Sequence, residues 1–415
     1  MRLICLLCMV LSVVSCKKEV EKQPVTMKED VFALADDTFN GRQTGTEGEL
    51  QAAKYIEDRF KQLALEPRGY LNNYTQTFTF KPSTNPHEKA EYTGLKTDST
   101  LTGTNVVAFL DNGAKNTVVI GAHYDHLGMG GEGSLYREEK AAIHNGADDN
   151  ASGVAVMLNL AERLNNAPKT ETRENNYLFI AFSGEEMGLL GSNYFVKNPT
   201  VPVESISYMI NMDMVGRLNE ENTIAVHGVG TSPIFKQALF ANNDFNLNIA
   251  EHNSGIGPSD HTSFYLADIP VLHFFTGQHE DYHKPGDDAE KLNYEGMQKI
   301  SDYIVAIITD LDDDGKLAFR KTKNESEEVP RFKVGLGVVP DYLFTGKGMR
   351  IDGVSEDKPA QKAGLQKGDV VVKLGEFEVT DMMSYMKALS TFEEGQTTQV
   401  TIMRNDAQQK VEVTF

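Results

Sequence analysis

Thr-Val-Val-Ile-Gly-Ala-His-Tyr-Asp, residues 117–125, joins a short apolar run to a histidine and an aspartate. The β-branched and small residues from Thr117 to Ala122 are typical of a buried β-strand. His123 at its end is a candidate metal ligand, and Asp125 could orient the ring by accepting a hydrogen bond from the second ring nitrogen. A histidine after a strand is more often a hydrogen-bonded loop residue, so this motif alone decides little.

The combination of an apolar run with a metal-binding side chain recurs along the chain. The further runs are Tyr177–Phe182 shortly before Glu186, Tyr208–Met212 before Asp213, and Pro270–Phe275 upstream of His283. Another candidate, Asp149, opens a predicted helix. Side chains that follow the strands of an α/β sheet meet beyond its carboxyl edge. The pattern therefore predicts a two-metal hydrolase site there, with these candidate ligands: His123, Asp149, Glu186, Asp213 and His283.

The composition is that of a globular protein with a strong negative charge. The chain has 415 residues, of which 40% are hydrophobic, enough for two or three domains with sizeable cores. It carries 60 Asp and Glu against 40 Lys and Arg, a formal net charge of −20. Nucleic-acid binding needs clustered cations, so we expect no nucleic-acid partner.

Residues 1–16 are predicted to be a signal peptide and not part of the fold. Arg2 is followed by an apolar stretch, Leu3–Val14, that is too short to span a bilayer. The Ser15-Cys16 end resembles the bacterial lipoprotein signal, which implies lipidation of Cys16. An ordinary secretory peptide is the alternative. We expect an exported protein that is lipid-anchored in the bacterial cell envelope, periplasmic or at the outer-membrane surface, with residues 17–30 as a tether.

Helical and strand-like patterns alternate from about Val31 to Asp312. Apolar residues recur at helical spacing in Glu47–Leu63 and Ala151–Leu164, and strand-like runs lie between such segments. This alternation predicts an α/β fold with a largely parallel central sheet flanked by helices. We assign residues 31–318 to this domain.

Two acidic motifs add chemistry to the predicted sheet. Residues 145–153, Asn-Gly-Ala-Asp-Asp-Asn-Ala-Ser-Gly, carry two adjacent aspartates where N-capping of a helix needs only one. In residues 182–188, Phe-Ser-Gly-Glu-Glu-Met-Gly, two adjacent carboxylates repel each other unless a cation or a proton compensates them. One glutamate could bind metal while the other holds a water, and a solvated loop is the alternative.

Taken together, the motifs resemble those of a known enzyme family. His-x-Asp, Gly-Ala-Asp-Asp-Asn-Ala-Ser-Gly, Gly-Glu-Glu-x-Gly-Leu-x-Gly-Ser, Asn-x-Asp-Met and Tyr-His-x-Pro-x-Asp occur in this order, and Phe39–Thr46 matches a segment near the start of the domain. The pattern is similar to the co-catalytic zinc peptidases related to bacterial leucyl aminopeptidase and glutamate carboxypeptidase. The resemblance covers about Val31 to Asp312.

The resemblance implies a cofactor of two Zn²⁺ ions with defined ligands. One ion would be bound by His123 and Asp213, and the other by Glu186 and His283. Asp149 would bridge the two ions, which gives each ion three protein ligands and leaves a position for a shared water.

The resemblance also implies catalytic residues. Glu185 would be the general base that takes a proton from the water and passes it to the leaving amine. Asp125 would orient His123, and Tyr282, which could equally be a core residue, would donate to the developing oxyanion. Supporting residues are expected at these positions: Asp148, Asn150, Asp260 and Asp287.

A long loop and scattered arginines bear on the choice of substrate. Gly128–His144 is rich in glycine, which indicates mobility near the mouth of the site and a part in substrate choice. The sequence has no obvious cluster of arginines to clamp a C-terminal carboxylate, which favours an aminopeptidase. Arg137, Arg173 and Arg217 keep a carboxypeptidase open.

A second, smaller domain is predicted at the end of the chain. The sequence turns polar after a predicted helix at Tyr294–Leu311, and residues 319–330 are assigned to a linker. Residues 331–415 are β-rich and resemble a PDZ domain in two motifs, residues 335–338 and Pro359–Asp369. This implies that a peptide C-terminus binds by strand addition, and packing against the first domain alone is the alternative. The peptide-binding residues would be Gly335, Leu336, Gly337 and Val338.

The sequence therefore predicts an exported zinc aminopeptidase that acts on peptide substrates, with a PDZ domain that recruits or regulates. A carboxypeptidase of the same fold is one alternative. A glutaminyl cyclase, which resembles this fold but uses one zinc, is another, and the presence of His123 argues against it. A non-catalytic PDZ scaffold is a further alternative, which an intact Glu185 and the full ligand set disfavour.

Overall fold

The computed structural model describes residues 25–82, 91–131, 133–138, 140–167, 174–323, 333–341, 343–344, 346–355, 358–405 and 407–415. Cys16, the predicted lipidation site, lies outside them. The predicted tether 17–30 is wrong at its end, because helix α1 (Met27–Leu34) begins inside it. Asp30 of this helix is buried and pairs at 2.7 Å with Arg59, so α1 belongs to the folded domain.

The centre of the first domain is a parallel sheet whose strands are the four predicted apolar runs. Their order across the sheet is β6 (Asn175–Phe182), β5 (Asn116–His123), β7 (Ile206–Met212) and β10 (Val271–Phe275). Neighbouring pairs are parallel, as predicted. Every residue of β6 and β7 is buried, which explains why these strands are mostly apolar and do not alternate.

Antiparallel strands extend this centre, so the sheet as a whole is mixed. On one side β4 (Leu101–Leu110) pairs antiparallel with β6, and β2 (Thr75–Lys81) and β3 (Glu91–Tyr92) follow it outward. The short β1 (Glu66–Pro67) pairs antiparallel with the end of β4. On the other side β8 (Thr223–His227) pairs antiparallel with β10, and β9 (Asn248–His252) is parallel to β8. Strand alternation alone did not reveal these reversals.

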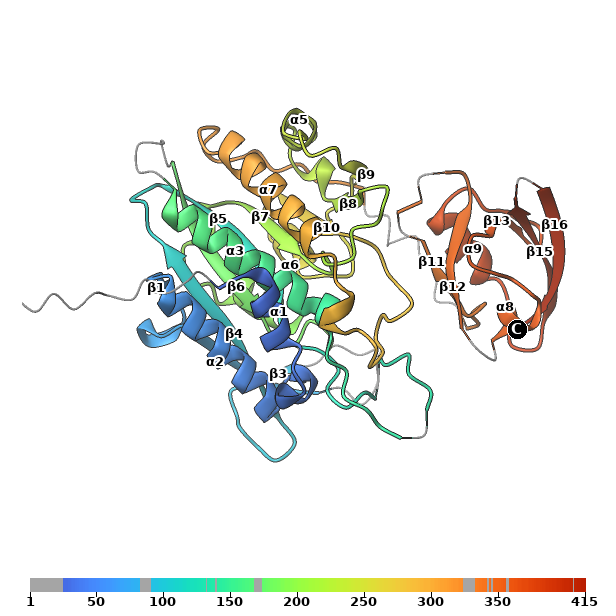
Figure 1. The fold of residues 1–415 in the computed structure, drawn as a ribbon, viewed down its shortest axis with the longest axis horizontal. Helices are drawn as coiled ribbons and strands as arrows, with labels where there is room; N and C mark the ends of the chain where they lie inside the picture. The colour runs from blue at the N-terminus through green and yellow to red at the C-terminus, as the bar shows by residue number, and fades with distance from the viewer. Residues whose placement is uncertain are drawn as a thin grey trace, which may run out of the picture.

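Helices cover both faces of the sheet (Figure 1). One face packs against α1, α2 (Glu47–Gln62), α3 (Gly153–Asn166) and α7 (Tyr294–Asp310), whose apolar sides form the larger core. The other face packs against α4 (Leu190–Lys197) and α6 (His261–Tyr265). Further elements are α5 (Phe235–Ala241) and short 3-10 turns at Asp37–Arg42, Tyr70–Asn72, Val203–Ser205, Val229–Thr231 and Ala289–Lys291.

The C-terminal domain has its own sheet and its own core. Its strands are β11 (Val338–Pro340), β12 (Met349–Val354), β13 (Val370–Leu374), β14 (Phe377–Glu378), β15 (Thr397–Arg404) and β16 (Ala407–Thr414), with helices α8 (Pro359–Lys362) and α9 (Met382–Leu389). Before this domain, residues of the predicted linker still contact the first domain, since the Arg320 N–H donates to the Thr231 carbonyl at 2.7 Å.

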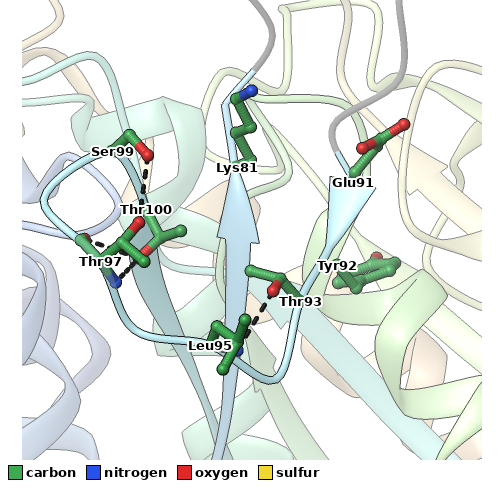
Figure 2. Close-up of a pocket in the computed structure, with 8 residues that line it drawn as sticks. All are labelled: Lys81, Glu91, Tyr92, Thr93, Leu95, Thr97, Ser99 and Thr100. Atoms are coloured by element: carbon green, nitrogen blue, oxygen red, sulfur yellow. Dashed lines mark hydrogen bonds between the residues drawn. The ribbon is translucent and has the colours of Figure 1, made fainter.

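No helix within the described residues combines the length and the apolar character needed to cross a membrane. A surface pocket lies at the edge of the first sheet, beside β2 and β3 (Figure 2). Thr97 and Thr100 in its wall hydrogen-bond to each other at 2.9 Å, and its lining includes none of the predicted site residues. The predicted ligands His123 and Asp213 lie elsewhere, at the carboxyl edge of the central strands.

Candidate metal centre

The structure brings the predicted metal ligands together at the carboxyl edge of the parallel strands. His123 is the last residue of β5, Asp213 directly follows β7, and Glu186 follows β6 after a tight turn. His283 lies in the long connection after β10 and has a positive φ of 54°. Asp149 comes from the segment before α3.

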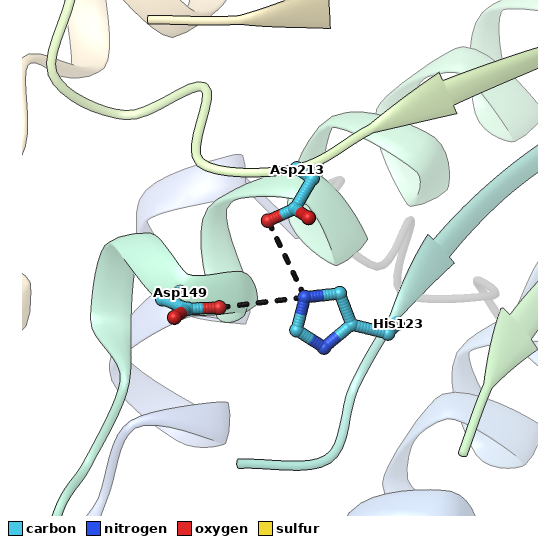
Figure 3. Close-up of side chains that lie close together, drawn as sticks. All are labelled: His123, Asp149 and Asp213. Atoms are coloured by element: carbon cyan, nitrogen blue, oxygen red, sulfur yellow. Dashed lines mark hydrogen bonds and ion pairs between the residues drawn. The ribbon is translucent and has the colours of Figure 1, made fainter. Parts of the chain in front are cut away.

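His123, Asp149 and Asp213 form a first group of donor atoms (Figure 3). The Nε2 atom of His123 lies 3.3 Å from Oδ1 of Asp149 and 3.3 Å from Oδ1 of Asp213. These side chains are between 1% and 14% exposed, so little water competes for them.

His283, Asp149 and Glu186 form a second group. The Nε2 atom of His283 lies 3.2 Å from Oδ2 of Asp149 and 3.3 Å from Oε2 of Glu186. Asp149 therefore directs one carboxylate oxygen toward each group, which is the arrangement of a carboxylate that bridges two metal ions.

The spacing of these donors fits tetrahedral metal ions. Two atoms that are each about 2.0–2.1 Å from a tetrahedral Zn²⁺ lie roughly 3.3 Å apart, and the four distances above are 3.2–3.3 Å. Mixed imidazole and carboxylate donors also suit zinc. The residues present therefore fit two divalent metal ions with Asp149 shared between them.

Asp149 lies where a helix begins, as predicted, in a π-helical turn (Ala147–Ser152) that leads into α3 at Gly153. Its own backbone departs from helical geometry, with φ and ψ of −104° and 89°. Asp287 accepts hydrogen bonds from the Asp148 and Asp149 backbone N–H groups at 2.9 and 3.0 Å. Asn150 donates to the Met212 carbonyl at 3.0 Å, which ties this segment to the end of β7. The supporting positions expected at Asp287 and Asn150 thus hold the backbone on both sides of Asp149.

Glu185 and Asp125 lie next to the first donor group. The Asp125 carboxylate accepts a hydrogen bond from the Glu185 backbone N–H at 3.1 Å, and Nδ1 of His123 lies 3.2 Å from the Asp125 carbonyl oxygen. The Asp125 carboxylate is farther from that nitrogen, at 3.7 Å. Asp125 is thus placed to orient His123 through its main chain and the Glu185 loop through its side chain.

Burial raises the pKa of Glu185 well above its usual range, and the carboxylates of Asp213 and Glu186 reinforce this shift. Asp260 is also fully buried near the site, and burial raises its pKa to about 7. A cation held by the ligands would favour the ionised form of each group. The crowding of carboxylates is thus a second sign that the site is built for positive charge.

Tyr282 and the loop 128–144 both contact His283. The Tyr282 ring stacks on the His283 ring with centroids 3.9 Å apart, and burial raises the pKa of the Tyr282 phenol well above its usual range. The Gly133 carbonyl accepts a hydrogen bond from Nδ1 of His283 at 2.8 Å, which directs Nε2 toward the donor group. This loop, predicted to influence substrate choice, therefore also orients a candidate ligand.

Three functional contacts were missed by sequence reasoning. His126 is buried and its Nδ1 lies 2.7 Å from Oε1 of Glu186. Arg42, 1% exposed, donates to the carbonyls of Tyr124 and Asn145 at 2.7 and 2.6 Å. Glu49 on α2 is buried and accepts from the Thr104 N–H at 3.0 Å and the Tyr124 hydroxyl at 3.3 Å. Of these, His126 had a local signal, a second imidazole three residues after His123, and Arg42 lies in the Phe39–Thr46 segment, whose resemblance gave it no role.

The predicted peptide site of the C-terminal domain lies at an open sheet edge. In the described part of the chain β11 pairs only with β12. The Leu336 and Gly337 carbonyls accept backbone hydrogen bonds from Ala360 and Ser355 at 2.8 Å, which fixes the loop before β11. Val338 is half-buried at the rim of the core, and residues of α9 also contact this core.

Comparison with known proteins identifies both domains. Residues 105–308 match the family model "Peptidase family M28", and residues 317–415 match "PDZ domain". The chain is 31% identical over 176 residues to the alkaline phosphatase isozyme conversion protein of Escherichia coli, covering 42% of this chain and 47% of that protein. It is 30% identical over 201 residues to the aminopeptidase YwaD of Bacillus subtilis, covering 46% of this chain and 40% of that protein.

A solved structure shows the same fold for the first domain. The zinc aminopeptidase BSAP of Bacillus subtilis superposes with a TM-score of 0.54 at 17% identity, covering 73% of this chain and 98% of that one. The chain spans less than half the length of the two curated relatives. Residues 105–308 therefore form a domain that matches peptidase family M28, and residues 317–415 form one that matches the PDZ family.

Proposed function

We propose that this protein is a zinc-dependent aminopeptidase with two Zn²⁺ ions, one at His123 and Asp213, the other at Glu186 and His283. The observation that carries the proposal is the pair of donor groups that share Asp149, each with donor spacings of 3.2–3.3 Å. Relatives named as an aminopeptidase and a zinc aminopeptidase support it.

The residues around the donors suit peptide hydrolysis. Zinc bound there would polarise the scissile carbonyl and acidify a water. Glu185, beside the first donor group, takes the proton from the attacking water and delivers it to the leaving amine. The Tyr282 hydroxyl keeps its proton because the pKa is raised, so it can donate to the oxyanion that forms on the carbonyl.

Charge favours the N-terminal end of a peptide as the bound end. Asp213 would be bound to zinc, but the Glu185 and Asp260 carboxylates beside the site are not candidate ligands, and in their ionised form they attract an α-ammonium group and repel an α-carboxylate. Arg217 is already engaged with Asp281 at 3.2 Å and with Asp287 at 3.5 Å, so it is not free to clamp a C-terminal carboxylate.

The test is mass spectrometry of a peptide mixture with free and blocked ends after incubation with the zinc-loaded protein. We expect stepwise loss of N-terminal residues, none with an EDTA-treated control, and none from N-acetylated peptides. C-terminal trimming would instead establish a carboxypeptidase, and loss of ammonia from N-terminal Gln a cyclase. Glu185→Gln should bind zinc normally and lose at least about 10²-fold in turnover, and normal turnover would refute its role.

We further propose that the PDZ domain holds the C-terminus of peptide substrates at residues 335–338, along the open edge of β11. A strand added antiparallel to β11 would run its N-terminal end toward the β11–β12 turn. Gly277 of the catalytic domain lies in the connection that leads from β10 to His283. Leu343, in the β11–β12 turn, lies beside it, with a side-chain carbon 3.0 Å from where a Cβ on Gly277 would stand. A held peptide would thus extend toward the catalytic domain.

Amidation of the substrate C-terminus tests the PDZ proposal. We expect amidation to raise KM for peptides long enough to span both domains, and to leave KM for an amino-acid anilide unchanged. Equal KM values for amidated and free long peptides would refute it.

We also propose that the protein is exported and anchored through a lipid on Cys16, on the strength of its resemblance to lipoprotein signals. Membrane fractionation of wild type and Cys16→Ser tests this, and a wild type that stays in the soluble fraction would refute it.

A further inference from the structure

His126 contacts the metal centre without belonging to the predicted ligand set. Its ring is buried, with Nδ1 2.7 Å from Oε1 of Glu186 and 3.8 Å from Oδ2 of Asp149. Within the described residues, donor atoms of His126, Asp149 and Glu186 all lie within 4.8 Å of one another, close enough to surround a metal ion. The question is whether His126 binds the metal or holds a ligand.

The distances favour a hydrogen bond between His126 and Glu186 over metal binding by His126. Donors that share one tetrahedral zinc lie roughly 3.3 Å apart, as His283 and Glu186 do. A separation of 2.7 Å between Nδ1 of His126 and Oε1 of Glu186 is instead that of a nitrogen–oxygen hydrogen bond to a carboxylate. The two oxygens of Glu186 therefore have different partners, Oε1 facing His126 and Oε2 facing His283.

The surrounding backbone fixes the ring of His126 in this direction. The His126 N–H donates to the Arg42 carbonyl at 3.3 Å. Gly146 lies against the ring, and a Cβ at Gly146 would stand 2.6 Å from the ring carbons, so only glycine leaves room. The imidazole is therefore held between the segment that carries Asp149 and the turn that carries Glu186.

We propose that His126 is a positioning residue of the metal centre, whose Nδ1–H holds Oε1 of Glu186 so that only Oε2 is offered to the second metal ion. A glutamate free of this bond could bind the ion with both oxygens and fill a coordination position needed by water or substrate. This inference rests on the two-zinc function proposed above but not on which end of a peptide is cleaved.

Side-chain substitutions separate a hydrogen-bond donor from a ligand and from simple packing. In His126→Asn the amide N–H₂ stands near the Nδ1 position and can still donate to Glu186. In His126→Gln it reaches the Nε2 position, and His126→Ala has no donor. His227→Asn is the matched control, because His227 is a histidine on β8 whose ring stacks on the His252 ring of β9 with centroids 4.2 Å apart, outside the loops that carry the candidate ligands.

The measurement is the affinity of the full chain for each of two Zn²⁺ ions, by competition with a chromophoric chelator, with thermal unfolding to confirm that each variant folds. We expect the second zinc to bind about 10–100-fold more weakly in His126→Ala and His126→Gln. His126→Asn and His227→Asn should stay within about threefold of wild type, well below that 10–100-fold loss.

Three results would overturn the inference. An unchanged zinc affinity in His126→Ala would show that the hydrogen bond does not matter. A loss in His126→Asn as large as in His126→Ala would show that the ring itself is needed, as a ligand or as packing. A wild-type chain that binds a single zinc would refute the two-zinc function as well, and the wild-type titration alone reveals it.

Discussion

Replacing the buried Arg42 with methionine tests whether this side chain holds the ligand-bearing segments together. Arg42 donates hydrogen bonds to the carbonyls of Leu34, Tyr124, Asn145 and Gly146 at 2.6–2.9 Å. Tyr124 directly follows the candidate ligand on β5, and residues 145 and 146 begin the segment that leads to Asp149. Methionine keeps the unbranched stem of the side chain, ends before the position of the guanidinium carbon, and removes every donor.

The expected loss of stability follows from the carbonyls left behind. Among the described contacts, the Leu34, Tyr124 and Asn145 carbonyls have Arg42 as their partner, whereas the Gly146 carbonyl also accepts from the Ala151 N–H at 3.2 Å. Each buried unpaired acceptor costs about 1–3 kcal/mol, and relief from burying the guanidinium offsets part of the sum. We expect a net loss of roughly 3–5 kcal/mol in the free energy of unfolding.

Calorimetric unfolding of the full chain measures this loss. At about 2–4 °C per kcal/mol, the catalytic domain of Arg42→Met should unfold roughly 10 °C below wild type. Arg163→Met is the matched control, because Arg163 pairs with Asp302 at 2.6 Å with its side chain 32% exposed. Such a pair is worth less than about 1 kcal/mol. An Arg42→Met midpoint within about 2 °C of wild type would refute the reasoning.

Three further predictions concern acid, metal and backbone packing. Burial lowers the pKa of His261 and His273 well below the usual value, so the unfolded chain takes up protons first as pH falls below about 6.5. Stability should then drop by up to about 2 kcal/mol per histidine at pH 5, and unfolding midpoints that fall equally in wild type and His261→Asn would contradict this. Chelation with EDTA should lower the unfolding midpoint of the catalytic domain, because the crowded carboxylates lose their counter-charge; an unchanged midpoint would exclude stabilisation by metal. Gly153→Ala should cost about 1–3 kcal/mol, since its Cβ would stand 2.5 Å from the Met212 carbonyl oxygen, whereas Gly94→Ala meets nothing within 4 Å and should be neutral in the same urea titration.

The central sheet was predictable from the sequence because its strands are buried on both faces. Tyr177–Phe182 and Tyr208–Met212 lie entirely within β6 and β7, and the helix predicted at Glu47–Leu63 is α2 to within one residue. The antiparallel direction of β4 and β8 was not predictable in the same way. Strand direction depends on the length and course of the connections, which a hydrophobic pattern does not encode.

The ligands were predictable for a related reason. Residues at the ends of parallel strands must converge, so His123 and Asp213 meet whatever the loops between them do. The backbone around Asp149 was not predictable, since a doubled aspartate before a helix is typical of an ordinary N-cap. Its irregular conformation depends on Asp287, which lies 138 residues away in sequence and accepts the Asp149 N–H.

Arg42 illustrates what motif analysis misses and why the site requires it. A guanidinium that paired directly with Asp149 or Glu186 would occupy the oxygens that face the histidine ligands. Arg42 instead donates its hydrogen bonds to main-chain carbonyls. Those of Tyr124, Asn145 and Gly146 lie 82–104 residues away in the sequence. Burial lowers its pKa to about 10, so it stays charged at neutral pH, and its charge still attracts the carboxylates of Asp149 and Glu186. The buried cation thus offsets part of the negative charge of the site and leaves every ligand oxygen free for metal.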